Sequence, residues 1–243
     1  INEIDTENIK YNEAKKGTME SLINGVLFGL NQKNYHIGGF NAYIECSIPR
    51  NVGLGSSANF GIMIGTIINH LYNEGQIENK YLVQIGRFAT NTFYCKPSGL
   101  MNECVCCVGG FIKVDFKDPN SPDICKLNID FSNFDYTLCS VNSNLIRSDN
   151  TVDYDAVPAE MIEVAHFFKK DVLREVSFDE FMKNYRIVRA RVGDRPALRA
   201  LHFFKEEERV LKQSEALERG DFDTFLRLVR ESGDSTFKAL QNI

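Results

Sequence analysis

The stretch that decides the fold reads Pro49-Arg50-Asn51-Val52-Gly53-Leu54-Gly55-Ser56-Ser57-Ala58. It follows residues 40–48, where side chains alternate as in a strand, and precedes residues 57–72, whose apolar side chains have helical spacing. A strand, a loop of glycine and serine, and a helix are therefore predicted in this order. Such a loop turns its backbone N–H groups inward in front of the positive end of a helix dipole, which suits an anion such as a nucleotide phosphate.

The loop is not the GxxxxGK[ST] type, because no lysine follows its second glycine. A simple helix cap is an equal alternative when the stretch is taken by itself. The residues on either side of the loop therefore have to decide between the two interpretations.

The rest of the chain predicts a mixed first part and a helical last part. We expect two lobes, residues 1–131 with the phosphate-binding loop and residues 132–243, which are mostly helical. His202, on the longest predicted helix, is interpreted as a hydrogen-bonded structural histidine. The predicted helices span 18–30, 57–72, 80–94, a short segment from about 100, 158–168, 177–185, 196–217 and 222–231, and the predicted strands span 40–48, 111–116, 124–129 and 136–141.

Composition excludes several classes of protein. With 28 Lys and Arg against 33 Asp and Glu, the net charge is −5 and no basic cluster occurs, which argues against a nucleic-acid partner. The longest apolar stretch, residues 60–71, is too short to span a membrane. We therefore expect a soluble, cytoplasmic protein that acts on small molecules.

The seven cysteines are an odd number without paired CxxC spacing, so reduced thiols are expected. Cys104, Cys106 and Cys107 lie close enough in sequence to ligate a metal. Buried packing is the favoured interpretation, because no second cysteine cluster completes a tetrahedral site.

Several segments resemble one known superfamily in the expected order. Residues 49–58 resemble the PxxxGLxSSA signature of the GHMP kinases, which include galactokinase, homoserine kinase and mevalonate kinase. Lys96-Pro97-Ser98-Gly99-Leu100-Met101-Asn102 resembles the PCGxMD segment of galactokinases, and Asp153-Tyr154 resembles their sugar-contacting tyrosine. Residues 198–204, 208–210 and 231–233 resemble helical stretches of their second lobe.

The resemblance implies an α+β, two-lobed GHMP-kinase-like fold, with a ribosomal-protein-S5-like N-terminal lobe and a ferredoxin-like, helical C-terminal lobe. It implies a sugar kinase that transfers the γ-phosphate of ATP to the C1 hydroxyl of galactose or a related sugar, with ATP and Mg²⁺ as cofactors. The family segments that flank this region do not occur between Ile1 and Ile243. We therefore expect the central part of the fold, incomplete at both ends.

The resemblance also assigns roles to single residues. Mg²⁺ is expected at Ser57 and at Thr90, which occupies the position of a family glutamate. The sugar is expected at Gly99 and Tyr154, and Asn102 occupies the position of the catalytic aspartate. The nucleotide phosphates are expected at Gly53, Leu54, Gly55, Ser56, Ser57 and Ala58.

Two expected carboxylates are therefore replaced by Thr90 and Asn102. An asparagine does not take up a proton at neutral pH, and a threonine brings no negative charge to a dication. Glu103 follows Asn102 but points about 100° away on a helix, which makes it a weak substitute. The alternative is a catalytically degenerate relative that senses a ligand or binds a protein partner, and a third hypothesis is an altered or incomplete version of an active enzyme.

Overall fold

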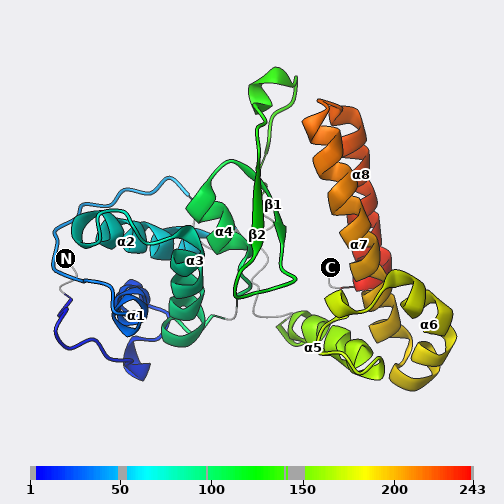
Figure 1. Cartoon of the computed structure of the whole chain (residues 1–243), viewed down its shortest axis with the longest axis horizontal. Helices are drawn as coiled ribbons and strands as arrows, with labels where there is room; N and C mark the ends of the chain where they lie inside the picture. The colour runs from blue at the N-terminus through cyan, green and yellow to red at the C-terminus, as the bar shows by residue number, and fades with distance from the viewer. Residues whose placement is uncertain (1–3, 49–53, 97, 140, 142–150, 242–243) are drawn as a thin grey trace. The chain divides into compact units, whose positions relative to one another are not determined.

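The computed structural model describes the chain except residues 1–3, 49–53, 97, 140, 142–150 and 242–243, and it omits the side chains of residues 151–155. It divides into two compact units, Ile1–Lys126 and Leu127–Ile243, which are described separately (Figure 1). The lobe boundary expected after residue 131 stays a prediction. Within the described residues, no helix combines the length and the apolar character needed to cross a bilayer.

The first unit is built on four α-helices. The side chain of Thr18 caps the first of them by accepting a hydrogen bond from the backbone N–H of Ser21, as the sequence predicts. The core lies where α1 and α2 face each other and contains Leu22, Val26 and Ile68, each at most 2% exposed. The helices are α1 (Met19–Gln32), α2 (Ser56–Tyr72), α3 (Asn79–Phe88), which continues as a π-helical segment (Ala89–Phe93), and α4 (Met101–Val108).

The sheet of this unit has two described strands, β1 (Phe111–Asp115) and β2 (Asp123–Leu127), which pair with each other. The strand predicted at residues 40–48 is wrong, since no described strand pairs with this segment. Of the four residues that alternation places on one face, Phe40, Ala42 and Ile44 line a cavity of about 290 Å³ beside α1 and α2, whereas Cys46 is exposed. Alternation selects a face, but a strand also needs a hydrogen-bonded neighbour.

The second unit is helical, with α5 (Thr151–Phe167), α6 (Phe178–Val192), α7 (Asp194–Glu218) and α8 (Phe222–Ser235). The strand predicted at residues 136–141 is wrong for its described residues. Tyr136 packs on the ring of Phe222 with a centroid distance of 5.0 Å, and Phe134 stacks on the same ring at 4.2 Å. Aromatic packing on α8, rather than a ladder of backbone hydrogen bonds, holds this segment.

Three polar residues of α7 are buried in the second unit, Arg199, His202 and Ser214. Arg199 is 0% exposed, donates through Nε to the carbonyl oxygen of Leu240 at 3.0 Å, and pairs with Glu160 of α5 at 2.9 Å. His202 shares a hydrogen bond between Nδ1 and Ser235 Oγ at 2.9 Å, which confirms its interpretation as a structural histidine.

Candidate functional site

The N-terminus of α2 is a candidate anion site. Gly55 immediately precedes the helix with φ of 67° and ψ of 25°, a left-handed conformation that favours glycine. Its carbonyl oxygen accepts the N–H of Asn59 at 2.9 Å, but within the described residues no side chain caps the helix. The first backbone N–H groups of α2, including those of Ser56 and Ser57, are therefore available to an anion, supported by the helix dipole.

The other residues predicted for the loop have different surroundings. Leu54 is 51% exposed, whereas Ala58 is 3% exposed and belongs to the packed face of α2. Ser57 lies half-buried in the first helical turn. Gly53 lies outside the described residues.

Helix α4 brings Asn102 to this helix start. A Cβ atom placed on Gly55 would lie 3.4 Å from Asn102 Cγ, so the side chain of Asn102 lies next to Gly55. One turn further along both helices, burial and then Glu103 raise the pKa of the Cys106 thiol, and Asn59 lowers it. The structure therefore joins two residues that are 47 positions apart and that the sequence assigned to one site.

Thr90 is buried in the π-helical segment, 1% exposed. Its hydroxyl donates to the carbonyl oxygen of Gly86 at 3.0 Å. This proton is therefore committed to the helix, while the oxygen lone pairs stay available.

The two predicted sugar residues belong to different units. Gly99 is exposed, and a Cβ placed on it would meet no atom within 4 Å. The turn before it is fixed by Asn91, whose Oδ1 accepts the backbone N–H of Ser98 at 2.8 Å and the Ser98 hydroxyl at 3.1 Å. Tyr154 belongs to α5 in the second unit, and its side chain lies outside the described part of the structure.

Glu103 is the residue that sequence reasoning undervalued. Its side chain turns away from Gly55, as the helical angle predicts, and its Cγ lies 3.3 Å from a Cβ placed on Gly86 of α3. It is 0% exposed, and neither carboxylate oxygen has a hydrogen-bond partner in the described structure. Burial raises its pKa, against the opposite effects of Arg87, Thr90 and Ser98. The available signal was its place between Leu100 and Cys104 on an apolar helix face.

Comparisons with known proteins agree on one family. Residues 21–110 match the GHMP kinases N terminal domain. A galactokinase of Clostridium tetani (strain Massachusetts / E88) is 27% identical over 231 residues, which cover 94% of this chain and 58% of the relative. A galactokinase of Lacticaseibacillus paracasei is 30% identical over 201 residues, which cover 81% of this chain and 50% of the relative.

A solved structure, Lactococcus lactis galactokinase complexed with galactose, superposes with a TM-score of 0.74 at 20% identity. The matched region covers 98% of this chain and 60% of the Lactococcus protein. The match confirms the expected α+β, GHMP-kinase-like fold. The chain thus spans about half to three-fifths of the length of the relatives it matches. Residues 21–110 thus match the GHMP kinases N terminal domain, and the chain is similar in sequence to galactokinases and shares the fold of one of them.

Proposed function

We propose that this chain is part of a galactokinase-type sugar kinase that transfers the γ-phosphate of ATP to the C1 hydroxyl of galactose or a related sugar. One observation carries the proposal: the N-terminus of α2, which no described side chain caps and which Gly55 opens in the left-handed conformation, lies next to the side chain of Asn102. The proposed phosphate site is therefore adjacent to Asn102, which occupies the position of the catalytic aspartate of galactokinases. Galactokinase relatives in three organisms, one of them complexed with galactose, support the choice of substrates.

The residues present fit a nucleotide phosphate. A Cβ on Gly55 would fill the space against Asn102 and would strain a backbone with positive φ, so glycine keeps the helix start open. Backbone N–H groups of Ser56 and Ser57 would hold phosphate oxygens. The loop residues Gly53, Leu54 and Ala58 belong to the same proposal.

The residues also fit Mg²⁺, because the hydroxyls of Ser57 and Thr90 and the unpartnered carboxylate of Glu103 are the oxygen donors that this ion prefers. When bound, Mg²⁺ neutralises phosphate charge during transfer. The hydroxyls of Ser57 and Thr90 would hold the ion together.

Asn102 determines how efficient this chemistry is. Its amide donates and accepts hydrogen bonds and so orients a sugar hydroxyl, but it does not remove the proton. Positioning by Gly99, Tyr154 and Asn102, with charge stabilisation by the helix start, leaves a slow transfer. A positioned general base typically contributes about 10²–10⁴-fold, and this factor is missing.

The second candidate function is a non-catalytic relative that binds nucleotide or sugar as a sensor, or that binds a protein partner. The absence of a carboxylate at both Asn102 and Thr90 favours it. Here the same helix start would bind the nucleotide phosphate without turnover.

A coupled assay of ADP release with ATP, Mg²⁺ and galactose tests the two functions. Under the kinase proposal the chain shows slow turnover, and Asn102→Asp raises it by about 100-fold because a base is restored. Thermal stabilisation by ATP and by galactose is measured in parallel, since a ligand of the folded state raises its stability. Ligand binding without turnover in the chain and in a variant with both Thr90→Glu and Asn102→Asp would establish the sensor instead.

A further inference from the structure

A fully buried carboxylate without a hydrogen-bond partner is costly and needs an explanation. Glu103 is such a group, since it is 0% exposed and both of its oxygens lack partners among the described residues. An unsatisfied buried polar group costs about 1–3 kcal/mol, and a charged one costs more. Something that the protein itself does not supply, a proton or a cation, must compensate this carboxylate.

The two hydroxyls that act on Glu103 have already committed their protons. The Thr90 hydroxyl donates to the carbonyl oxygen of Gly86 at 3.0 Å, and the Ser98 hydroxyl donates to Asn91 Oδ1 at 3.1 Å. Each hydroxyl has only one proton to donate but keeps lone pairs. Thr90, Ser98 and Glu103 therefore present oxygen acceptors to one another, an arrangement that attracts a cation.

We propose that Glu103, Thr90 and Ser98 form a binding site for a divalent cation of the magnesium class. Within the described structure, no group of three His, Cys, Asp or Glu residues is placed to hold a metal ion. The proposed site is therefore not one in which protein side chains supply all of the ligands. Mg²⁺ instead is typically bound by one or two carboxylates, with phosphates and water completing its coordination. Glu103 supplies the single carboxylate and so replaces the family glutamate, whose position is occupied here by Thr90.

The fold places Glu103 next in the chain to a residue of the proposed phosphate site, with its side chain directed at α3. Glu103 follows Asn102, whose side chain contacts Gly55 at the start of α2. The stem of Glu103 also packs on Gly86, and the same point of α3 faces Ile62 of α2. The inference rests on the proposed function in one respect: the phosphates of a bound nucleotide would complete the coordination of the cation.

Binding of Mn²⁺, followed by electron paramagnetic resonance with and without ATP, tests the site without relying on turnover. We expect the unaltered chain to bind Mn²⁺, more tightly with ATP, and Glu103→Gln to weaken this binding at least tenfold. A double variant with Thr90→Glu and Glu103→Gln returns a carboxylate to the same oxygens and should recover most of the affinity. Circular dichroism verifies that each variant is folded.

The matched control is Glu78→Gln, because Glu78 is a surface acid of the same unit, 62% exposed and paired with Lys80. It should leave Mn²⁺ binding unchanged. Equal Mn²⁺ affinity in the unaltered chain and in Glu103→Gln, or no Mn²⁺ binding in either, would overturn the cation site and leave a neutral, structural carboxylic acid. Loss of Mn²⁺ binding in Glu103→Gln together with no ATP binding in any form would uphold the cation site and reject the nucleotide function.

Discussion

Among the described residues, each unit buries one charged side chain completely, and the two have different partners. Arg199 of the second unit donates through Nε to the carbonyl oxygen of Leu240 and has Glu160 as a counter-charge, although its Nη1 and Nη2 make no hydrogen bond in the described structure. In the first unit, neither carboxylate oxygen of Glu103 has a hydrogen-bond partner in the described structure, and Arg87 offsets only part of the effect of burial on its pKa. Removing a charge from water is tolerated only when partners replace the water. Arg199 therefore stabilises the fold through its ion pair, whereas Glu103 belongs to the proposed cation site.

The largest expected effect comes from breaking the compensated pair. Glu160→Gln leaves the guanidinium of Arg199 buried without a counter-charge and also removes the ion pair of Glu160 with Arg195, and we expect the free energy of unfolding to fall by about 3 kcal/mol. Urea denaturation followed by circular dichroism measures it, since the chain has no tryptophan.

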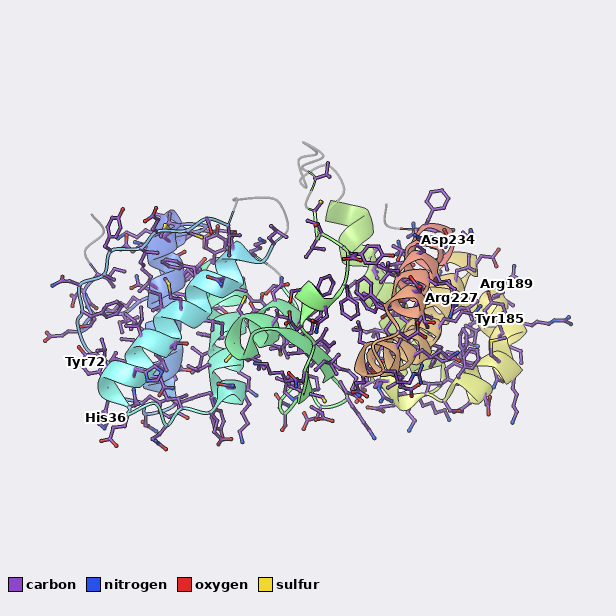
Figure 2. The ribbon with its side chains drawn as sticks, turned by 90° about the horizontal axis from the view of Figure 1, so that it is seen from above. His36, Tyr72, Tyr185, Arg189, Arg227 and Asp234 are labelled. Atoms are coloured by element: carbon purple, nitrogen blue, oxygen red, sulfur yellow. The ribbon has the colours of Figure 1, made fainter. Side chains whose placement is uncertain are left out.

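The control for this pair is Glu231→Gln, at an exposed ion pair with Arg227 on α8, which Figure 2 labels at the surface of the helix. An exposed i,i+4 pair contributes about 0.3–0.5 kcal/mol, so this loss should be small. Equal losses in the two variants would mean that the Arg199 pair stabilises no more than a surface contact.

The opposite sign is expected at Glu103. In metal-free buffer at pH 7, Glu103→Gln removes a desolvated, unpartnered carboxylate, and the free energy of unfolding should rise by about 1–3 kcal/mol. The same urea experiment, run with EDTA, measures the change. If Glu103→Gln destabilises the chain as Glu160→Gln does, Glu103 has compensating partners and the contrast between the two charges disappears.

A smaller effect is expected at the start of α2. Gly55→Ala places a Cβ 3.4 Å from Asn102 on a backbone with φ of 67°, a left-handed conformation that costs a non-glycine residue about 1–2 kcal/mol. ATP-dependent stabilisation should fall as well, because the helix start closes. Gly99→Ala is the control, since its Cβ would meet nothing within 4 Å. A Gly55→Ala variant with unchanged stability and ATP response would contradict the proposed phosphate site.

The helices and the chain order of the site could be predicted because they depend on local signals. Thr18 and the apolar spacing that follows it were sufficient to predict α1, and Ser177 caps α6 in the same way. The two wrong strands, over 40–48 and 136–141, failed because pairing depends on a distant neighbour that alternation does not identify. The aromatic packing of Tyr136 on Phe222 connects residues 86 positions apart, which local patterning does not show.

The candidate site was predictable to the same extent. Gly55 and Asn102 were assigned to one site from ordered resemblance, and their contact agrees with that assignment. The environment of Glu103 was not predictable. Helix geometry predicts that its side chain points away from that of Asn102, but it does not predict which residues surround the carboxylate. Only the packing of α4 on α3 shows that it meets Gly86 in a water-free position.

The smallest effect is expected from pH at His202, the other titratable group buried on α7. Burial, and then the charge of Arg209, lower the pKa of His202 below its usual 6.5, so the folded chain prefers the neutral ring. The unfolded chain therefore binds more protons as the pH falls below about 6.5, and stability present at pH 7–8 is lost on acidification. His202→Asn keeps a polar group near Ser235 but does not titrate, so the fall in melting temperature between pH 7.5 and 5.5 should be shallower than in the unaltered chain. His36→Asn, at an exposed ring that Figure 2 labels, is the control and should leave the slope unchanged. Parallel slopes for the unaltered chain and His202→Asn would show that this histidine, although buried, is compensated in both charge states, unlike Glu103.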